Sequence, residues 1–197
     1  MKKLSTLIVS LSMLLLSACG GGSDPKEPAV VVAFGDSLTN DGGQWVTPSE
    51  LWVERLKSAV TAQGLDAERS VTIYNEGLGG ENSIDAVDRL AGVLADRKPT
   101  HVILMHGTND IPPFCLECPN DITRPDLEAM AKMAQDAGAE VIMGEFTLKA
   151  FGGDMAQAYS KAYQTAAYNS GSAYVNMTTN IPYTGEFYHF DGIHFTD

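Results

Sequence analysis

Short apolar runs alternate along this chain with longer stretches in which apolar and polar residues are mixed. Apolar runs that are bounded by polar residues, glycine or proline are typical of strands buried on both faces of a sheet. We predict strands at 29–34, 71–75, 101–106, 140–146 and 173–177.

The stretches between these runs carry the start and stop signals of helices. We predict helices at 47–63, 82–96, 123–138 and 154–169. Strands that alternate with helices indicate βαβ units. We therefore expect an α/β fold in three layers, in which helices cover both faces of a central parallel sheet of about five strands.

The first of these helices has the clearest cap. Thr47 is a favoured N-cap residue, Pro48 suits the first helical position, and Glu50 completes a capping box. Gly64 is a stop signal. We expect one helix to run without interruption from about residue 47 to residue 63.

The N-terminus differs from the rest of the chain. Lys2 and Lys3 precede a short apolar run at 4–16, and Leu-Ser-Ala then comes directly before Cys19. This pattern indicates a bacterial secretory signal that is cut before a lipidated cysteine. The alternatives are an ordinary signal peptide cleaved nearby and an N-terminal membrane anchor, although a spanning helix needs about 20 apolar residues.

The lipoprotein interpretation divides the chain into three parts. Residues 1–18 would be the signal peptide, 19–28 a flexible Gly- and Pro-containing tether, and 29–197 one globular domain. We expect the protein in the bacterial cell envelope, with membrane contact only through the lipid on Cys19.

The charge balance narrows the class of partners. The formal net charge is −12 at pH 7. Nucleic acid and anionic lipid headgroups are not attracted to such a surface, so we expect neither as a partner.

Two cysteines remain once Cys19 is set aside. Cys115 and Cys118 are close in sequence, on a proline-flanked loop, and an oxidising compartment favours a local disulfide between them. A thioredoxin-like redox pair is the alternative, but that motif opens a helix after a strand.

Reactive side chains follow the predicted strands. Ser37 comes just after the first strand and Asn109 just after the third, while Asp191 and His194 lie near the end of the sequence. Ligands of open α/β sheets bind outside the carboxyl ends of the strands. These residues supply a nucleophile, an amide donor, a carboxylate and an imidazole.

Four short blocks occur in a definite order. They are Gly35-Asp36-Ser37-Leu38, the segment 75–80, Gly107-Thr108-Asn109-Asp110, and Asp191-x-x-His194. In these blocks, from about Val30 to its last residue, the chain resembles the SGNH hydrolases, also called the GDSL esterase/lipase family. The resemblance implies a flavodoxin-like sheet and ester hydrolysis without metal or cofactor. The family usually continues into a C-terminal helix. This sequence stops three residues after His194, so either the sequence is truncated or this member lacks that helix.

The chemistry assigns a role to each of these residues. Ser37 is the expected nucleophile and His194 its base, later the acid for the leaving alkoxide, while Asp191 orients the imidazole. The family resemblance implies three oxyanion donors: the backbone N–H groups of Ser37 and Gly80 and the side-chain amide of Asn109.

Other residues near the blocks receive weaker assignments. Asp36 and Asp110 are expected to be structural, since aspartates in tight Gly-containing loops commonly bond the nearby backbone. Trp45, His106 and Phe114 are candidates for lining the substrate pocket. For His106 the alternative is a buried histidine at a strand end.

We expect a small-molecule or carbohydrate ester as the substrate. The compact chain favours small acyl groups of the acetyl type, transferred through a Ser37 acyl-enzyme to water. The alternatives are an acyltransferase of the same fold, a non-catalytic glycan-binding surface lipoprotein, and a dithiol protein that uses Cys115 and Cys118.

Overall fold

The computed structural model describes residues 27–40, 46–110, 115–146, 152–179 and 194. Its sheet has five parallel strands in the order β2-β1-β3-β4-β5, which is a doubly wound, flavodoxin-like order. The strands are β1 (Ala29–Gly35), β2 (Val71–Gly77), β3 (His101–Met105), β4 (Glu140–Glu145) and β5 (Ala173–Asn176). The predicted strands and three-layer α/β/α fold are confirmed, with ends that differ by at most two residues.

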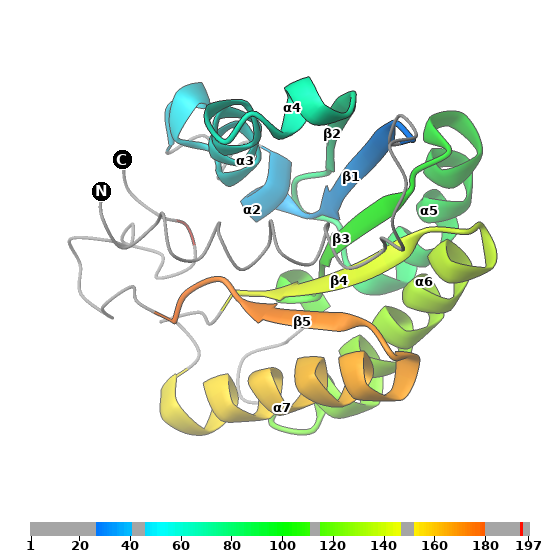
Figure 1. Cartoon of the computed structure of the whole chain (residues 1–197). Helices are drawn as coiled ribbons and strands as arrows, with labels where there is room; N and C mark the ends of the chain where they lie inside the picture. The colour runs from blue at the N-terminus through cyan, green and yellow to red at the C-terminus, as the bar shows by residue number, and fades with distance from the viewer. Residues whose placement is uncertain (1–26, 41–45, 111–114, 147–151, 180–193, 195–197) are drawn as a thin grey trace.

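Alternate residues of the strands point to opposite faces of the sheet, as the two-residue period of a strand requires. One face packs against α5 (Ser83–Arg97), α6 (Arg124–Asp136) and α7 (Gly152–Ser170). The other face packs against α3 (Trp52–Ala62). Figure 1 shows α3 on the opposite side of the sheet from α6 and α7.

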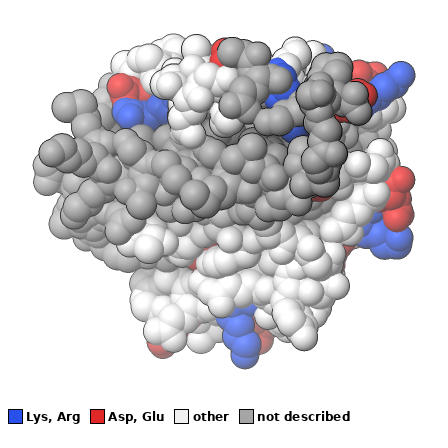
Figure 2. Space-filling model, viewed as in Figure 1, with Lys and Arg blue, Asp and Glu red and all other residues white. Residues whose placement is uncertain are grey.

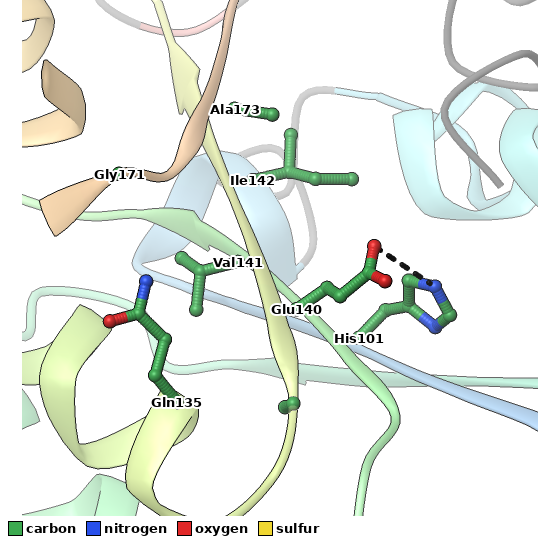
Figure 3. A pocket seen from close by; sticks show the side chains of 8 residues that line it. His101, Gln135, Glu140, Val141, Ile142, Gly171 and Ala173 are labelled. Carbon is green, nitrogen blue, oxygen red and sulfur yellow. Dashed lines mark ion pairs between the residues drawn. The ribbon is translucent and has the colours of Figure 1, made fainter. Parts of the chain in front are cut away.

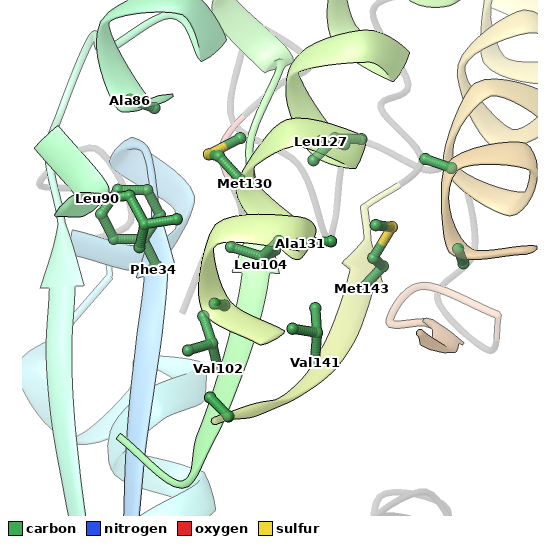
Figure 4. Close-up of a cluster of buried hydrophobic side chains, with 14 of the residues drawn as sticks. Phe34, Ala86, Leu90, Val102, Leu104, Leu127, Met130, Ala131, Val141 and Met143 are labelled. Atoms are coloured by element: carbon green, nitrogen blue, oxygen red, sulfur yellow. The ribbon is translucent and has the colours of Figure 1, made fainter. Parts of the chain in front are cut away.

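The larger core lies between the sheet and the first of these helix layers (Figure 4). Its strand side chains alternate with those of the smaller core on the other face. Fully buried members drawn in Figure 4 are Phe34, Leu90, Leu104, Leu127, Met130 and Met143. Burying each side chain of this size contributes about 1.5–3 kcal/mol to the stability of the fold. The loops at the ends of the strands are therefore anchored to a stable core.

The uninterrupted helix predicted from residue 47 is wrong. A single 3-10 turn, η2 (Pro48–Glu50), comes first, Leu51 is extended with ψ of 134°, and α3 begins only at Trp52. Glu50 pairs with Arg55 on α3, so its carboxylate is directed away from the Thr47 end and does not close a capping box.

The remaining helices follow their predicted signals closely. Asn82 caps α5, since its side chain accepts a hydrogen bond of 2.9 Å from the N–H of Asp85. A π-helical turn, η4 (Pro119–Thr123), leads into α6. Further short helical turns that the hydrophobic pattern does not predict are α2 (Ser37–Asn40), α4 (Leu65–Glu68) and η3 (Thr108–Asp110). Among the described residues, no helix has both the length and the apolar character that crossing a membrane requires.

Candidate active site

The three residues expected to carry oxyanion donors lie at one edge of the sheet. Ser37 lies two residues beyond β1, Gly80 three beyond β2, and Asn109 four beyond β3. Because these three strands are parallel neighbours, the loops that follow them meet at the carboxyl edge. The fold therefore explains why residues from three separate sequence blocks share one place.

Gly35 makes the sharp turn that presents Ser37. A Cβ atom on Gly35 would lie 2.1 Å from Thr39 Oγ1 and 2.7 Å from the carbonyl oxygen of Met105. Any side chain there would force β1 and β3 apart. Glycine thus lets β1 turn directly into α2, whose first residue is Ser37.

The Ser37 hydroxyl contacts the imidazole of His194. Oγ lies 2.8 Å from Nε2, although 157 residues separate the two in sequence. Ser37 itself is half-buried. This is the geometry in which an imidazole removes the proton of an attacking serine. Asp191 lies outside the described residues, so its contact with the imidazole remains a prediction.

The loop after β2 passes beside the serine. A Cβ on Gly79 would be 3.9 Å from that of Ser37. Gly80 has φ of +78° and open space around the position of a Cβ, so its glycine is required by backbone conformation and not by crowding. The side chain of Asn75 ties this loop to α2 by donating to the carbonyl oxygens of Thr39 (2.8 Å) and Asn40 (3.1 Å).

Asn109 is exposed at the same edge, and its amide is oriented by the loop after β2. Nδ2 donates a hydrogen bond of 2.9 Å to the main-chain oxygen of Glu81. An amide nitrogen carries two hydrogens, so this bond leaves one of them for a ligand. The neighbouring Asp110 accepts from Ser83 N–H and from Thr123 Oγ1, both at 2.7 Å, which is the structural role expected for it.

Asp36 is buried directly behind the serine, with 1% of its surface exposed. Its Oδ1 accepts a hydrogen bond of 3.0 Å from the N–H of Leu38. Burial raises the pKa of Asp36, while the charge of His106 and hydrogen bonds from Leu38 and Thr108 act in the opposite direction. Its position agrees with a structural role.

His106 does not line a pocket, and the prediction that it does is wrong. The residue is fully buried, with its ring 5.3 Å from the ring of Phe34. Its Nε2 lies 3.0 Å from Oε2 of Glu81. The alternative of a buried histidine at a strand end describes it correctly. The reason is tertiary: α7 and the loop after β2 close over the end of β3.

The sequence reasoning missed Glu81 and Arg89. Arg89 donates from Nε (2.7 Å) and Nη2 (2.6 Å) to the two carboxylate oxygens of Glu81. Burial alone would raise the pKa of Glu81, but its contacts with His106 and Arg89 and the charges of both lower that pKa to about 2. The available signal was an acid next to Gly80 followed by an arginine on the succeeding helix.

Cys115 and Cys118 are joined by a disulfide, with Cα atoms 5.4 Å apart. Cys118 directly precedes η4. The pair therefore lies near the start of a helix, whereas the flanking prolines had indicated only a loop. Cys19, Trp45 and Phe114 lie outside the described residues. Within the described ranges, no three His, Cys, Asp or Glu side chains converge as a metal site.

Two further features of the described surface lie apart from Ser37. Figure 2 shows acidic and basic side chains next to one another at several places on the face it draws. Figure 3 shows a hollow of about 350 Å³ at the start of β4 and β5, where His101 Nε2 lies 3.8 Å from Glu140 Oε2. It is at the amino edge of the sheet, opposite Ser37, and belongs to no part of the site.

Known proteins resemble this chain in sequence and in fold. A model of the GDSL-like lipase/acylhydrolase family matches residues 33–197. An arylesterase of Vibrio mimicus is 28% identical over 137 residues, which are 70% of this chain and 63% of that protein. The esterase TesA of Pseudomonas aeruginosa is 27% identical over 150 residues, 74% of this chain and 68% of that protein. The uncharacterized lipoprotein YqeF of Bacillus subtilis is 32% identical over 108 residues, 53% of this chain and only 40% of that protein.

Solved structures agree on the fold. The crystal structure of TesA superposes with a TM-score of 0.71 at 24% identity and covers 85% of this chain and 89% of that one. The psychrotrophic esterase EstA from Pseudoalteromonas, inhibited by monoethylphosphonate, superposes with a TM-score of 0.68 at 20% identity. The match covers 85% of this chain and 87% of that one. Together with the family model that spans the whole site, these likenesses place the chain: it belongs to the GDSL-like lipase/acylhydrolase family.

Proposed function

We propose that this protein is a serine esterase that hydrolyses carboxylic esters through an acyl-enzyme on Ser37. The observation that carries the proposal is the 2.8 Å contact between Ser37 Oγ and His194 Nε2. A serine hydroxyl becomes a useful nucleophile when a base is placed to take its proton. The names of the arylesterase and esterase relatives point to the same class of reaction.

The first step joins the acyl carbon to the serine. Oγ of Ser37 attacks the ester carbonyl while Nε2 of His194 takes the hydroxyl proton. The carbonyl oxygen gains negative charge, and the N–H groups of Ser37 and Gly80 and the amide of Asn109 are the proposed donors to it. Each such donor contributes roughly 10²–10³-fold to the rate.

The second half of the reaction releases the acid. The imidazolium gives its proton to the leaving alkoxide, which departs as the alcohol and leaves the acyl group on Ser37. Water then attacks the acyl carbon while His194 takes its proton; the bond from the acyl carbon to Oγ breaks, the acid leaves, and His194 returns the proton to Oγ. Asp191 is proposed to hold the imidazole in the orientation that both proton transfers need.

Small acyl groups are the proposed substrates, with acetyl groups on carbohydrates as one class. Gly79, Gly80 and Asn109 are all exposed, so the ester reaches the donors from the surface. A long acyl chain would stay largely in water at an exposed site and gain little binding from its added apolar surface, so we expect short acyl esters to turn over faster.

Hydrolysis of p-nitrophenyl esters from acetyl to palmitoyl tests both the serine mechanism and the preference for small acyl groups. We expect the purified wild type to cleave the acetyl ester and Ser37→Ala to lose at least ~10³-fold in kcat. Activity that survives in Ser37→Ala would refute the serine mechanism. Equal or faster turnover of palmitoyl than of acetyl esters would refute the substrate class alone.

We also propose that residues 1–18 are removed and that Cys19 carries the lipid that holds the protein in the cell envelope. The sequence pattern before Cys19 and a relative that is named a lipoprotein support this. Residues 29–197 then form the hydrolase domain, since β1 begins at Ala29. Radiolabelled palmitate should label the wild type in a bacterial host but not Cys19→Ala; equal labelling of both would exclude Cys19 as the attachment site.

A further inference from the structure

Each loop that carries a proposed oxyanion donor also places an ionisable side chain in the interior. Asp36 precedes Ser37, Glu81 follows Gly80, and His106 lies three residues before Asn109. All three ionisable residues are buried, at 1%, 7% and 0% exposure. Burying a charged group costs free energy unless the group is paired. The partners of these three residues beneath the donors therefore decide that cost.

Two of these buried groups, Glu81 and His106, are in direct contact. Glu81 receives two hydrogen bonds from Arg89 on α5, and its Oε2 also lies 3.0 Å from Nε2 of His106. Asp36 interacts electrostatically with the same imidazole. The guanidinium of Arg89 is itself held, because it lies 4.1 Å from the centre of the Phe34 ring and donates to the main-chain oxygen of Glu76 at 3.1 Å. The Glu81 carboxylate is therefore held by Arg89 and lies against His106.

The main chain of Glu81 connects these buried side chains to the donors. Its carbonyl oxygen accepts the hydrogen bond of 2.9 Å from Asn109 Nδ2. Its N–H donates to the carbonyl of Leu78 at 3.3 Å, which closes the turn that contains Gly80. Because Asn109 is exposed, hydrogen bonding and not packing sets the orientation of its amide.

We propose that Glu81, clamped between Arg89 and His106, is a positioning residue that fixes the Asn109 amide and the Gly80 peptide as oxyanion donors. The inference rests on the proposed esterase activity. Glu81 touches no substrate and acts through its own main chain. A donor must be held close to its productive geometry, and a displacement of about 1 Å costs about 10²-fold in rate.

The chain contains a matched control for the clamp. Arg97 stands on the same helix, donates one hydrogen bond of 2.7 Å to Glu76, and lies over the Tyr74 ring at 4.4 Å, so like Arg89 it joins an acid and an aromatic ring, but at a more exposed place. Arg97 is at the other end of α5, away from the donors. Lysine keeps the charge but loses the two-pronged geometry of arginine.

The test compares Arg89→Lys and Glu81→Gln with Arg97→Lys. For p-nitrophenyl acetate we expect the first two to lower kcat by roughly 10- to 100-fold with KM changed less than about twofold, and Arg97→Lys to change neither. If Arg89→Lys and Glu81→Gln lose stability but show no fall in kcat at nearly constant KM, the inference is overturned. If Glu81→Gln does not fold, Arg89→Lys alone decides.

A second readout is independent of catalysis. The side-chain amide signals of Asn109 in a ¹H–¹⁵N spectrum are assigned as those absent from Asn109→Asp. We expect Arg89→Lys to shift or broaden them and Arg97→Lys to leave them unchanged; unchanged signals in Arg89→Lys would overturn the inference. A wild type without esterase activity would refute the proposed function, and this amide readout would then decide the positioning role by itself.

Discussion

The hydroxyl of Tyr163 on α7 serves both main-chain polar groups of His106 at the end of β3. It accepts a hydrogen bond of 2.9 Å from the N–H of His106 and donates to the carbonyl oxygen of the same residue. Tyr159, one turn earlier on α7, donates to that carbonyl at 3.2 Å. A helix thus supports the loop that leads to Asn109 by satisfying backbone groups that β3 no longer pairs.

Removing this hydroxyl should destabilise the protein. In Tyr163→Phe the buried N–H of His106 loses its partner, and an unsatisfied buried group of this kind costs about 1–3 kcal/mol. Urea denaturation measures the loss. Tyr168→Phe is the control on the same helix, because Tyr168 is 87% exposed. Equal stability of the two variants would contradict the supporting role of Tyr163.

The backbone of Gly80 should matter for activity more than for stability. Alanine at a positive φ costs about 1–2 kcal/mol, and relief of that strain would turn the Gly80 N–H away from the site. We expect Gly80→Ala to lower kcat by roughly 10²-fold, the effect of losing one oxyanion donor. Thermal denaturation and p-nitrophenyl acetate kinetics measure the two effects.

Gly64→Ala is the matched control for this prediction. Gly64 has φ of +69° and, like Gly80, no atom within 4 Å of the place that a Cβ would take, but it ends α3. We expect Gly64→Ala to lose about as much stability as Gly80→Ala but to keep the kcat of the wild type. A similar fall of kcat in both variants would mean that the effect of Gly80→Ala is general strain and not a lost donor.

Low pH should destabilise the folded protein in part because Glu81 becomes protonated. Its pKa is lowered from the ordinary 4.5 to about 2 by Arg89 and His106, so its ionised form stabilises the fold. This contribution is complete above pH 4.5 and is lost as the pH falls toward 2; the full difference corresponds to about 3 kcal/mol. The stability gap between wild type and Glu81→Gln should therefore shrink by about 2 kcal/mol between pH 6 and pH 3. A gap that stays constant with pH in urea denaturation would exclude this linkage.

The disulfide between Cys115 and Cys118 should contribute to stability and not to catalysis. Closing so short a loop stabilises by about 2 kcal/mol in the chain-entropy model. We expect the double variant Cys115→Ser/Cys118→Ser to lose about that much in urea denaturation and to keep its esterase activity within about twofold. Loss of activity at unchanged stability would instead favour the dithiol interpretation.

The strands, most helices and the order of the site blocks could be predicted because their signals are local. An apolar run such as 29–34 is buried wherever the sheet forms, and Asn82 caps a helix through a neighbour three residues away. Parallel topology then places Ser37, Gly80 and Asn109 at one edge. The break at Leu51 escaped prediction because Arg55, a side-chain partner on the next helix, draws Glu50 away from the capping box.

The sequence by itself therefore determined the α/β class and the five strands, and it supplied the candidates for the reactive residues. Only the tertiary structure decided which polar residues meet. It brings Ser37 Oγ to 2.8 Å from His194 across 157 residues, and it buries His106 against Glu81 and not in a pocket. The physical reason is that hydrophobic periodicity reports which face of an element is covered, whereas pairing between buried charges depends on how separate elements pack.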